Sequence, residues 1–369
     1  MKKNAWSIGL LAVVILIILG AMSLSRPESS SAKAPEIEKI LSLKTTKEQS
    51  VELINLMERV GPLEAQENLL SSGLPFTGET HLLVHTIGDY VYENYGLEGL
   101  PNCRDYFLSA CYHGFILNAL AEYGLDGMAE VMQECEKVGP GVAPQCAHGA
   151  GHGFVVWHDY NLVKGAEMCD ALGEKLNTFY YNNCYDGVFM ENVWGVHDGA
   201  PSDKRWVSDT DIYYPCTDLR IPEKYLGGCW SNQATLIYQH FKGDLKKTAE
   251  ACDEVENAGY KETCYNNFSR QIHPLTNGQV ERVFSLCQNA TGENWKNYCI
   301  NANMSAYWSV GDRVAPFKIC EMQSDEPQKH CFQNLAGMIR YQYSHMPAEM
   351  QRYCDKIPNT EERNTCLVN

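Results

Sequence analysis

The chain has 369 residues, of which 46 are acidic and 30 basic, and its formal net charge is -16. Such an acidic surface argues against binding to nucleic acids and to anionic membrane surfaces, and it favours cations or a basic partner. A chain of this length usually suggests two domains. Internal repetition instead predicts a single repeat domain.

The N-terminus has the pattern of an exported, membrane-anchored protein. Residues 1–4 include two lysines, and residues 5–24 form an apolar run long enough to cross a bilayer as a helix. The lysines are expected to stay in the cytoplasm. Residues 25–35 would then be a linker, and residues 36–369 an extracytoplasmic domain. We predict an uncleaved single-pass anchor in the cell membrane; cleavage as a signal peptide would make the protein secreted.

All sixteen cysteines lie beyond residue 100, and none forms a CxxC motif. This pattern favours disulfides in an oxidising compartment over cysteine metal sites. Consecutive cysteines pair naturally across short segments. We predict the eight disulfides Cys103–Cys111, Cys135–Cys146, Cys169–Cys184, Cys216–Cys229, Cys252–Cys264, Cys287–Cys299, Cys320–Cys331 and Cys354–Cys366.

The second cysteine of each pair recurs with a period near 35 residues, which is the length of an α-hairpin repeat of the tetratricopeptide type. Each unit has an amphipathic stretch, a polar loop and a second helical stretch, and strand-like alternation is scarce. We therefore predict an all-α solenoid of about nine hairpins, similar to TPR, Sel1 or HEAT repeats, with one disulfide across each hairpin loop.

The first helices are expected at residues 47–60, 62–70 and 79–95. A capping box, Thr45 to Glu48, opens the first of them, and Pro62 opens the second. In a later unit we expect helices at residues 245–252 and 263–273, joined by a polar loop. The joint at residues 195–214 is longer than the others, and it is either a lid over a site or a plain surface loop.

Histidines recur at matching positions of the second helices. His148 and His152 are four residues apart and share a helical face, as His81 and His85 do. Two residues after the second cysteine of each pair, at a position that we call the first column, the units carry His113, His148, Asp186, Ser231, Asn266, Asn301 and Gln333. Six residues after the same cysteine, at a position that we call the second column, the units carry Leu117, His152, Met190, Thr235, Arg270, Ser305 and Gly337. The ionisable groups of the first column are confined to the front of the chain.

Glycines follow the first column at Gly114, Gly149 and Gly187. A glycine inside a helix costs about 1 kcal/mol against alanine, so the pattern indicates either close helix approach or room for a ligand. The run Gly149, Gly151 and Gly153 around His152 favours room for a ligand.

We predict that His81, His85, His113, His148 and His152 bind a transition metal. Imidazole suits Zn, Cu or Fe, and the cysteines are expected in disulfides. Asp186 and Glu191 are candidate ligands or proton-transfer groups. The alternative is a ladder of histidines that hydrogen-bond to neighbouring helices.

Adjacent helices lie 8 to 10 Å apart and can share an ion, whereas helices two apart can do so only if the solenoid curves sharply. One ion or two are both compatible with the pattern.

Two functions fit these patterns. The first is metal-dependent chemistry or metal capture on the inner face. The second is a binding or scaffold protein that holds a peptide, protein or glycan on a concave inner face of Asn, Gln and aromatic residues, the aromatic ones including Tyr185, Trp230, Tyr265 and Phe332.

The phrases Cys-Tyr-His-Gly at 111–114, His-Gly-Ala-Gly-His-Gly at 148–153 and Cys-Tyr-Asp-Gly-Val-Phe-Met-Glu-Asn at 184–192 resemble those of an uncharacterised group of exported microbial proteins. That resemblance implies no particular activity. At the level of fold, histidines at equivalent helical repeats are similar to deoxyhypusine hydroxylase, a HEAT-repeat di-iron enzyme. That family uses His-Glu pairs, which are not found here, so the similarity implies only that repeats can build a metal site.

Overall fold

The computed structural model describes residues 35–369 apart from residues 73, 75–76, 140, 177–179, 196–203, 289–292, 345 and 368–369. The predicted membrane segment at residues 5–24 therefore lies outside the described residues. Within the described part, no helix combines the length and the apolar character needed to cross a bilayer.

The all-α prediction is confirmed for the described chain. Its α-helices are α2 (Pro35–Leu41), α3 (Thr46–Val60), α4 (Pro62–Ser71), α5 (Gly78–Tyr95), α6 (Ala110–Val138), α7 (Ala143–Trp157), α8 (Leu162–Lys175), α9 (Tyr181–Trp194), α10 (Leu226–His240), α11 (Leu245–Asp253), α12 (Ala258–Ser269), α13 (Ile272–Leu275), α14 (Val280–Gln288), α15 (Glu293–Ser309), α16 (Ala315–Glu321), α17 (Asp325–Tyr343), α18 (Pro347–Cys354) and α19 (Thr360–Leu367). Two 3₁₀ helices, η1 (Gly96–Asn102) and η2 (Glu223–Tyr225), complete the set.

Helix ends follow local capping chemistry. The predicted capping box is present, with the Glu48 N–H donating to Thr45 Oγ1 at 3.2 Å and the Thr45 N–H donating to the Glu48 carboxylate at 3.1 Å. The helix expected at residues 263–273 was placed wrongly. It begins at Ala258, because the Asn257 side chain accepts from the backbone N–H groups of the first turn, and it ends at Ser269.

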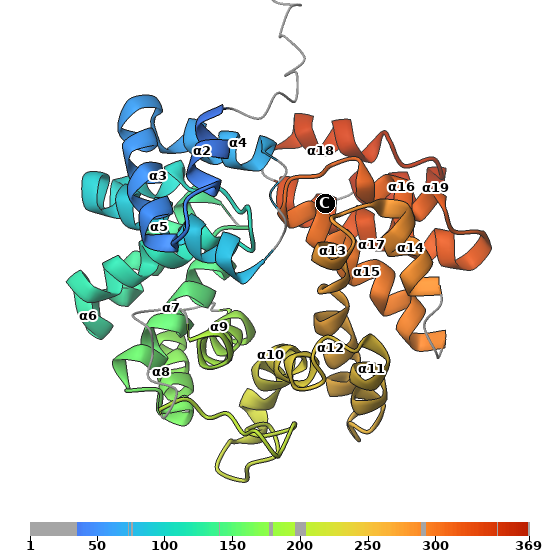
Figure 1. Cartoon of the computed structure of the whole chain (residues 1–369). Helices are drawn as coiled ribbons and strands as arrows, with labels where there is room; N and C mark the ends of the chain where they lie inside the picture. The colour runs from blue at the N-terminus through green and yellow to red at the C-terminus, as the bar shows by residue number, and fades with distance from the viewer. Residues whose placement is uncertain are drawn as a thin grey trace, which may run out of the picture.

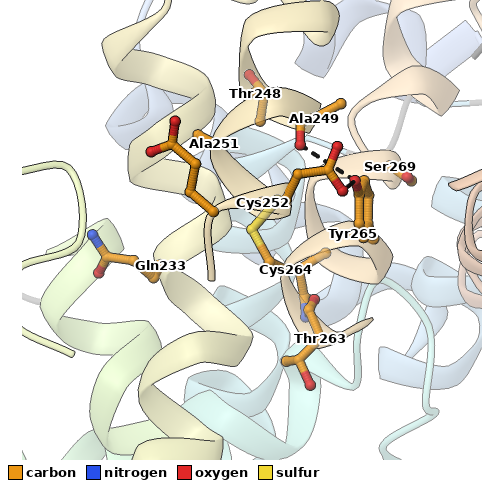
Figure 2. Close-up of a disulfide and its surroundings, with 12 residues drawn as sticks. Gln233, Thr248, Ala249, Ala251, Cys252, Thr263, Cys264, Tyr265 and Ser269 are labelled. Carbon is orange, nitrogen blue, oxygen red and sulfur yellow. Dashed lines mark hydrogen bonds between the residues drawn. A yellow bond between two sulfur atoms is a disulfide. The ribbon is translucent and has the colours of Figure 1, made fainter. Parts of the chain in front are cut away.

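All eight predicted disulfides are confirmed, and no described cysteine is free. Figure 2 shows the pair Cys252–Cys264, which links the end of α11 to the middle of α12. The Tyr265 hydroxyl donates to the Asp253 carboxylate beside the bridge. Six of the disulfides join two helices of one repeat, whereas Cys103 and Cys216 lie in non-helical segments and are bonded to α6 and α10.

The repeats curve into a ring (Figure 1). Helices α5, α6, α7, α9, α10, α12, α15 and α17 pack in succession around its centre, and the blue N-terminal helices come back against the red C-terminal ones. Two polar contacts close the ring. The Phe107 N–H donates to the Ser309 carbonyl at 2.7 Å, and Gln342 Nε2 donates to the Asp105 carboxylate at 2.8 and 2.7 Å. Because the ring is closed, its inner helices face a common interior.

The predicted aromatic inner face is not found. Tyr185, Trp230, Tyr265 and Phe332 are 6%, 6%, 3% and 1% exposed and belong to the hydrophobic cores. Each follows a cysteine by one residue, and one residue along an α-helix turns the side chain by about 100°. These rings therefore point between packed helices, whereas the column one residue later points into the ring.

Candidate metal centre

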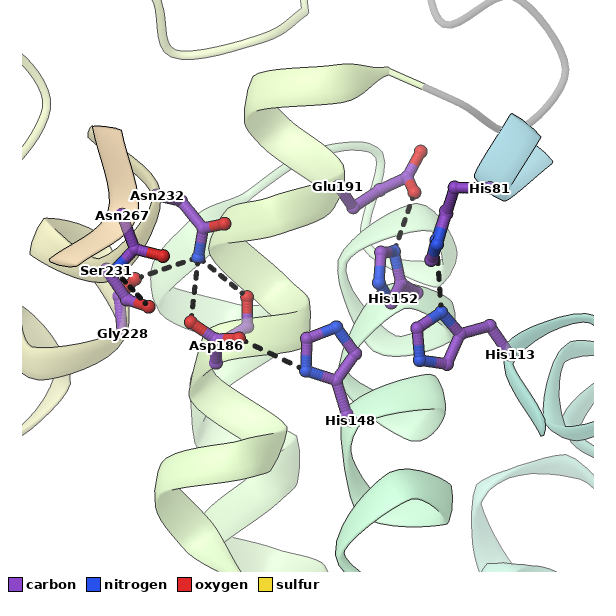
Figure 3. A network of polar contacts seen from close by, with 10 residues as sticks. All are labelled: His81, His113, His148, His152, Asp186, Glu191, Gly228, Ser231, Asn232 and Asn267. Carbon is purple, nitrogen blue, oxygen red and sulfur yellow. Dashed lines mark hydrogen bonds and ion pairs between the residues drawn. The ribbon is translucent and has the colours of Figure 1, made fainter. Parts of the chain in front are cut away.

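The five predicted histidines converge on one buried cluster built by α5, α6 and α7. His81, His85, His113, His148 and His152 are 8%, 3%, 1%, 7% and 0% exposed. Ring centroids lie 4.7 Å apart for His81 and His85, 4.7 Å for His113 and His148, and 5.1 Å for His113 and His152. Figure 3 shows four of the rings together. Helices two apart in the repeat order thus reach the same site.

Glycines bring these helices close enough for their histidines to meet. A Cβ on Gly151 would lie 2.0 Å from the Cys184 carbonyl oxygen, and one on Gly187 would lie 2.0 Å from the His148 carbonyl oxygen. No real side chain fits at those distances. The backbones of α7 and α9 therefore approach each other in a way that only glycine permits.

The neighbouring glycines of α7 have the same role. A Cβ on Gly149 would lie 3.1 Å from Ile116 Cβ, and a Cβ on Gly153 would lie 2.3 Å from Leu120 Cδ2. The expectation that this run leaves room for a ligand beside His152 is wrong, because neighbouring helices fill the space.

His81, His85 and His113 form a first triad, with one candidate ligand atom from each within 4.8 Å of the others. His81 Nε2 lies 3.0 Å from His85 Nε2 and 3.3 Å from His113 Nδ1. Two nitrogens bound to one tetrahedral zinc ion would be about 3.3 Å apart, given bonds of about 2.0 to 2.1 Å. The spacing therefore matches a shared ion.

The orientation of His81 is set by the backbone. Its Nδ1 lies 2.7 Å from the Phe107 carbonyl oxygen, which can only accept a hydrogen bond. His81 Nδ1 therefore carries the proton, and Nε2 presents its lone pair to the cluster. Phe107 also donates its N–H to one of the two contacts that close the ring, so this residue links ring closure to the placement of His81.

His113, His148 and His152 form a second triad, in which one candidate ligand atom from each residue also lies within 4.8 Å of the others. Figure 3 shows their rings facing one another on α6 and α7. His113 Nε2 and His148 Nε2 are buried and have no hydrogen-bond partner among the described residues. A buried polar atom left unsatisfied costs about 1 to 3 kcal/mol, so an additional partner at this point would stabilise the fold.

Two carboxylates from α9 hold the outer side of the second triad. Asp186 Oδ2 lies 3.2 Å from His148 Nδ1, and Glu191 Oε2 lies 2.9 Å from His152 Nδ1. Glu191 is fully buried and accepts a second hydrogen bond from the Tyr160 hydroxyl at 2.8 Å. Carboxylates in this position orient metal-binding imidazoles and raise their basicity.

The protonation states of the cluster suit metal binding. Burial lowers the pKa of His113 well below its ordinary value of 6.5, and the neighbouring histidines lower it further. Desolvation alone would raise the pKa of Asp186, but hydrogen bonds from His148 and Ser231 and the charge of Arg270 leave it below its ordinary value. At neutral pH the site therefore combines a neutral imidazole with an ionised carboxylate.

The cluster is reached from the interior of the ring. His81 lines a cavity of about 250 Å³, and His148 and Asp186 line a second cavity of about 350 Å³. Leu108, Met190 and Arg270 line both. Each triad is thus accessible from its own cavity.

Three of the described histidines outside the repeat columns lie apart from the centre. His240 and His330 are exposed, His273 is buried against Tyr307, and His345 lies outside the described residues. The described end of the long joint packs on α9, where the Trp206 N–H donates to Asn192 Oδ1 at 2.7 Å.

Sequence reasoning missed Tyr160, the Phe107 carbonyl and Arg270. Tyr160 and Phe107 lie in loops, and nothing in the spacing of the repeat marks them. Arg270 does occupy the second column, at the position of His152 in its own repeat. The signal that could have identified Arg270 is that it is a cation, whereas its neighbours in that column, Thr235 and Ser305, are neutral.

No protein-family model and no curated protein matches this chain. The resemblance of its cysteine and histidine phrases to exported microbial proteins remains a prediction. The case for function therefore depends on the geometry of the site.

Proposed function

We propose that the protein is an extracytoplasmic metal-binding protein, anchored to the membrane by residues 5–24, with a transition-metal ion held by His113, His148 and His152. The observation that carries the proposal is the pair of buried, unpartnered Nε2 atoms on His113 and His148. In a complete hydrogen-bonded ladder, both atoms would have partners. A metal ion supplies the missing interaction for both.

The residues around this site support its role. Asp186 and Glu191 engage the Nδ1 atoms of His148 and His152, and this leaves their Nε2 atoms directed inward. In this proposal the two carboxylates are positioning residues instead of direct ligands. Three imidazoles with an open fourth position form the ligand set of catalytic zinc sites. Zn is the first candidate, with Cu or Fe as alternatives.

His81 and His85 extend the centre toward the other cavity. The imidazole of His113 presents Nδ1 to His81, while its Nε2 is available to the second triad. In the proposal, the first triad provides a second, weaker site, because binding of two ions would require a deprotonated His113 bridge. An ion exposed to the ring interior would polarise a bound substrate or activate a water molecule.

Metal analysis of the purified protein tests the proposal. Wild-type protein, loaded with Zn, Cu or Fe and desalted, should retain at least one ion per chain. His148→Ala/His152→Ala should lose the tight ion, whereas His81→Ala/His85→Ala should keep it. His330→Ala is the matched control, because that side chain is 68% exposed and distant from the site.

Absence of a tightly bound ion from wild-type protein under all three loading conditions would reject the metal centre. The competing function, a scaffold for a peptide, protein or glycan, loses the aromatic part of its expected inner face, since those rings are buried, whereas the polar part is present where Asn266 and Asn301 line an open cavity. Disulfides throughout the described repeats support an oxidising, extracytoplasmic location.

A further inference from the structure

Arg270 stands out in the interior of the ring because it is a cation without a direct partner. It caps the C-terminus of α12 and lines both cavities that adjoin the histidine centre. Its Nε is buried without a hydrogen-bond partner, and no described carboxylate forms an ion pair with it. The side chain is partly exposed to these cavities, and no ion pair or hydrogen bond among the described residues explains its position there.

The nearest negative charge is already engaged. Asp186 interacts electrostatically with Arg270, but its carboxylate is held by His148 at 3.2 Å and by Asn232 Nδ2 at 3.0 Å. The guanidinium therefore remains available to a ligand. Arginine stays protonated in proteins and presents a planar fork of donors that matches a carboxylate.

The cavity beside His81 fits a small anion. Its lining combines Arg270 with the neutral polar side chains of Asn232, Thr235, Asn267 and Gln271, and it includes one carboxylate, that of Glu79, but no lysine and no other arginine. One guanidinium balances the single charge of a carboxylate better than the double charge of a phosphate. The net charge of -16 repels anions from the outer surface, so attraction at this point is a local property.

We propose that Arg270 binds the carboxylate of a small organic acid within the ring, with the opposite end of that molecule reaching the histidine centre. The cavity of about 250 Å³ has room for a small organic acid. This assignment rests on the proposed metal function for the identity of the second contact. Binding of the carboxylate itself depends only on Arg270 and the cavity.

Ligand titration of the disulfide-intact protein, loaded with Co²⁺ and with Zn²⁺, tests the assignment. The probes are acetate, glycolate and malonate, with inorganic phosphate and acetamide for comparison. Carboxylates should bind and should perturb the visible spectrum of the Co²⁺ form, while acetamide should not. Arg270→Gln should weaken carboxylate binding about 10- to 100-fold, the range for loss of a charge-assisted pair, and Arg270→Lys should weaken it less.

Metal content and unfolding separate this proposal from the metal proposal. Arg270→Gln should retain its ion, because Arg270 forms no contact with His113, His148 or His152, and its unfolding midpoint should stay close to that of wild type. His148→Ala/His152→Ala should lose the ion but still bind carboxylates when observed by NMR or calorimetry. Equal carboxylate binding by wild type and Arg270→Gln would overturn the assignment, as would binding of phosphate alone or of no probe.

Discussion

The N-terminal repeats, which carry the histidines and are here called the front, differ from the later, back repeats in how neighbouring inner helices pack. In the front repeats, Gly187 places its backbone directly against the His148 carbonyl, with no space for a Cβ. At the same register in the next repeat, Asn232 fills the gap, and its Nδ2 donates to the Asp186 and Gly228 carbonyls, both at 3.1 Å. Close approach at Gly187 brings the imidazoles together in the front repeats, whereas in the next repeat α10 approaches α9 at Gly228 and the Asn232 amide bridges the two helices.

The consequence appears in the inner column. The front histidines are buried against one another, but Asn266 and Asn301 of the back repeats line an open cavity of about 590 Å³. The repeat provides the same scaffold throughout, and the choice of glycine or asparagine decides whether its inner residues meet. Chemistry is therefore expected in the front half and ligand access in the interior.

Substitution of a front glycine should have the largest effect. Gly151→Ala places a Cβ 2.0 Å from the Cys184 carbonyl oxygen and should destabilise the protein by about 4 kcal/mol or more, because two backbones must separate. The matched back variant is Gly337→Ala, where a Cβ meets nothing within 4 Å. It should stabilise the protein by up to about 1 kcal/mol. Urea denaturation measures both, and equal effects would contradict the comparison.

Removal of one disulfide should separate stability from metal binding. Replacing Cys135 and Cys146, or Cys354 and Cys366, with serine opens loops of 11 and 12 residues, so each should cost about 3 kcal/mol. Only the front variant should weaken metal binding, since Cys146 lies two residues before His148. Chemical unfolding and metal titration report the two effects, and equal metal loss in both variants would count against a local centre.

Acid should destabilise both halves, through different histidines. Burial lowers the pKa of His273 from 6.5 to about 4, despite the nearby charge of Asp312. The unfolded chain binds this proton first, so the stabilisation is complete above pH 6.5 and is lost as the pH falls toward 4. The loss should reach about 3 kcal/mol for this group. Burial shifts the pKa of His113 in the same direction.

Unfolding of metal-free protein between pH 7 and 4 measures that dependence. His273→Gln should reduce the slope, and bound metal should steepen it, because protons and the ion compete for the front imidazoles. A metal-free slope that is unchanged in His273→Gln would contradict the assigned role of His273.

Loss of one bridging amide should have the smallest destabilising effect. The Asn303 side chain donates to the Ser269 carbonyl at 3.0 Å and the Cys299 carbonyl at 2.8 Å. Asn303→Ala should cost about 1 to 2 kcal/mol and leave metal content unchanged. A change in metal stoichiometry would show that the back repeats control the centre directly.

Much of the fold was accessible from the sequence because the constraints are local and repeated. The regular spacing of cysteines predicts both the hairpins and their disulfides, and the matching positions of His81, His113 and His148 predict a shared inner face. Closure of the ring depends on contacts far apart in the chain, such as Asp105 with Gln342, which no periodicity reveals. Curvature in turn depends on how closely each pair of helices packs.

The site was predicted in part for the same reason. Histidine positions follow the repeat and were identified, but the glycine run around His152 was misread, because packing partners such as Leu120 lie on another repeat. Hydrogen bonds to the outer nitrogens come from α9 and from loops. They turn a row of histidines into oriented triads, and only coordinates reveal them.

Anomalous diffraction from crystals soaked with Zn²⁺ tests the central claim most directly. We expect a strong zinc peak about 2.0 to 2.1 Å from the Nε2 atoms of His113, His148 and His152. Water density bonded to the Nε2 atoms of His113 and His148, with no anomalous signal, would contradict it.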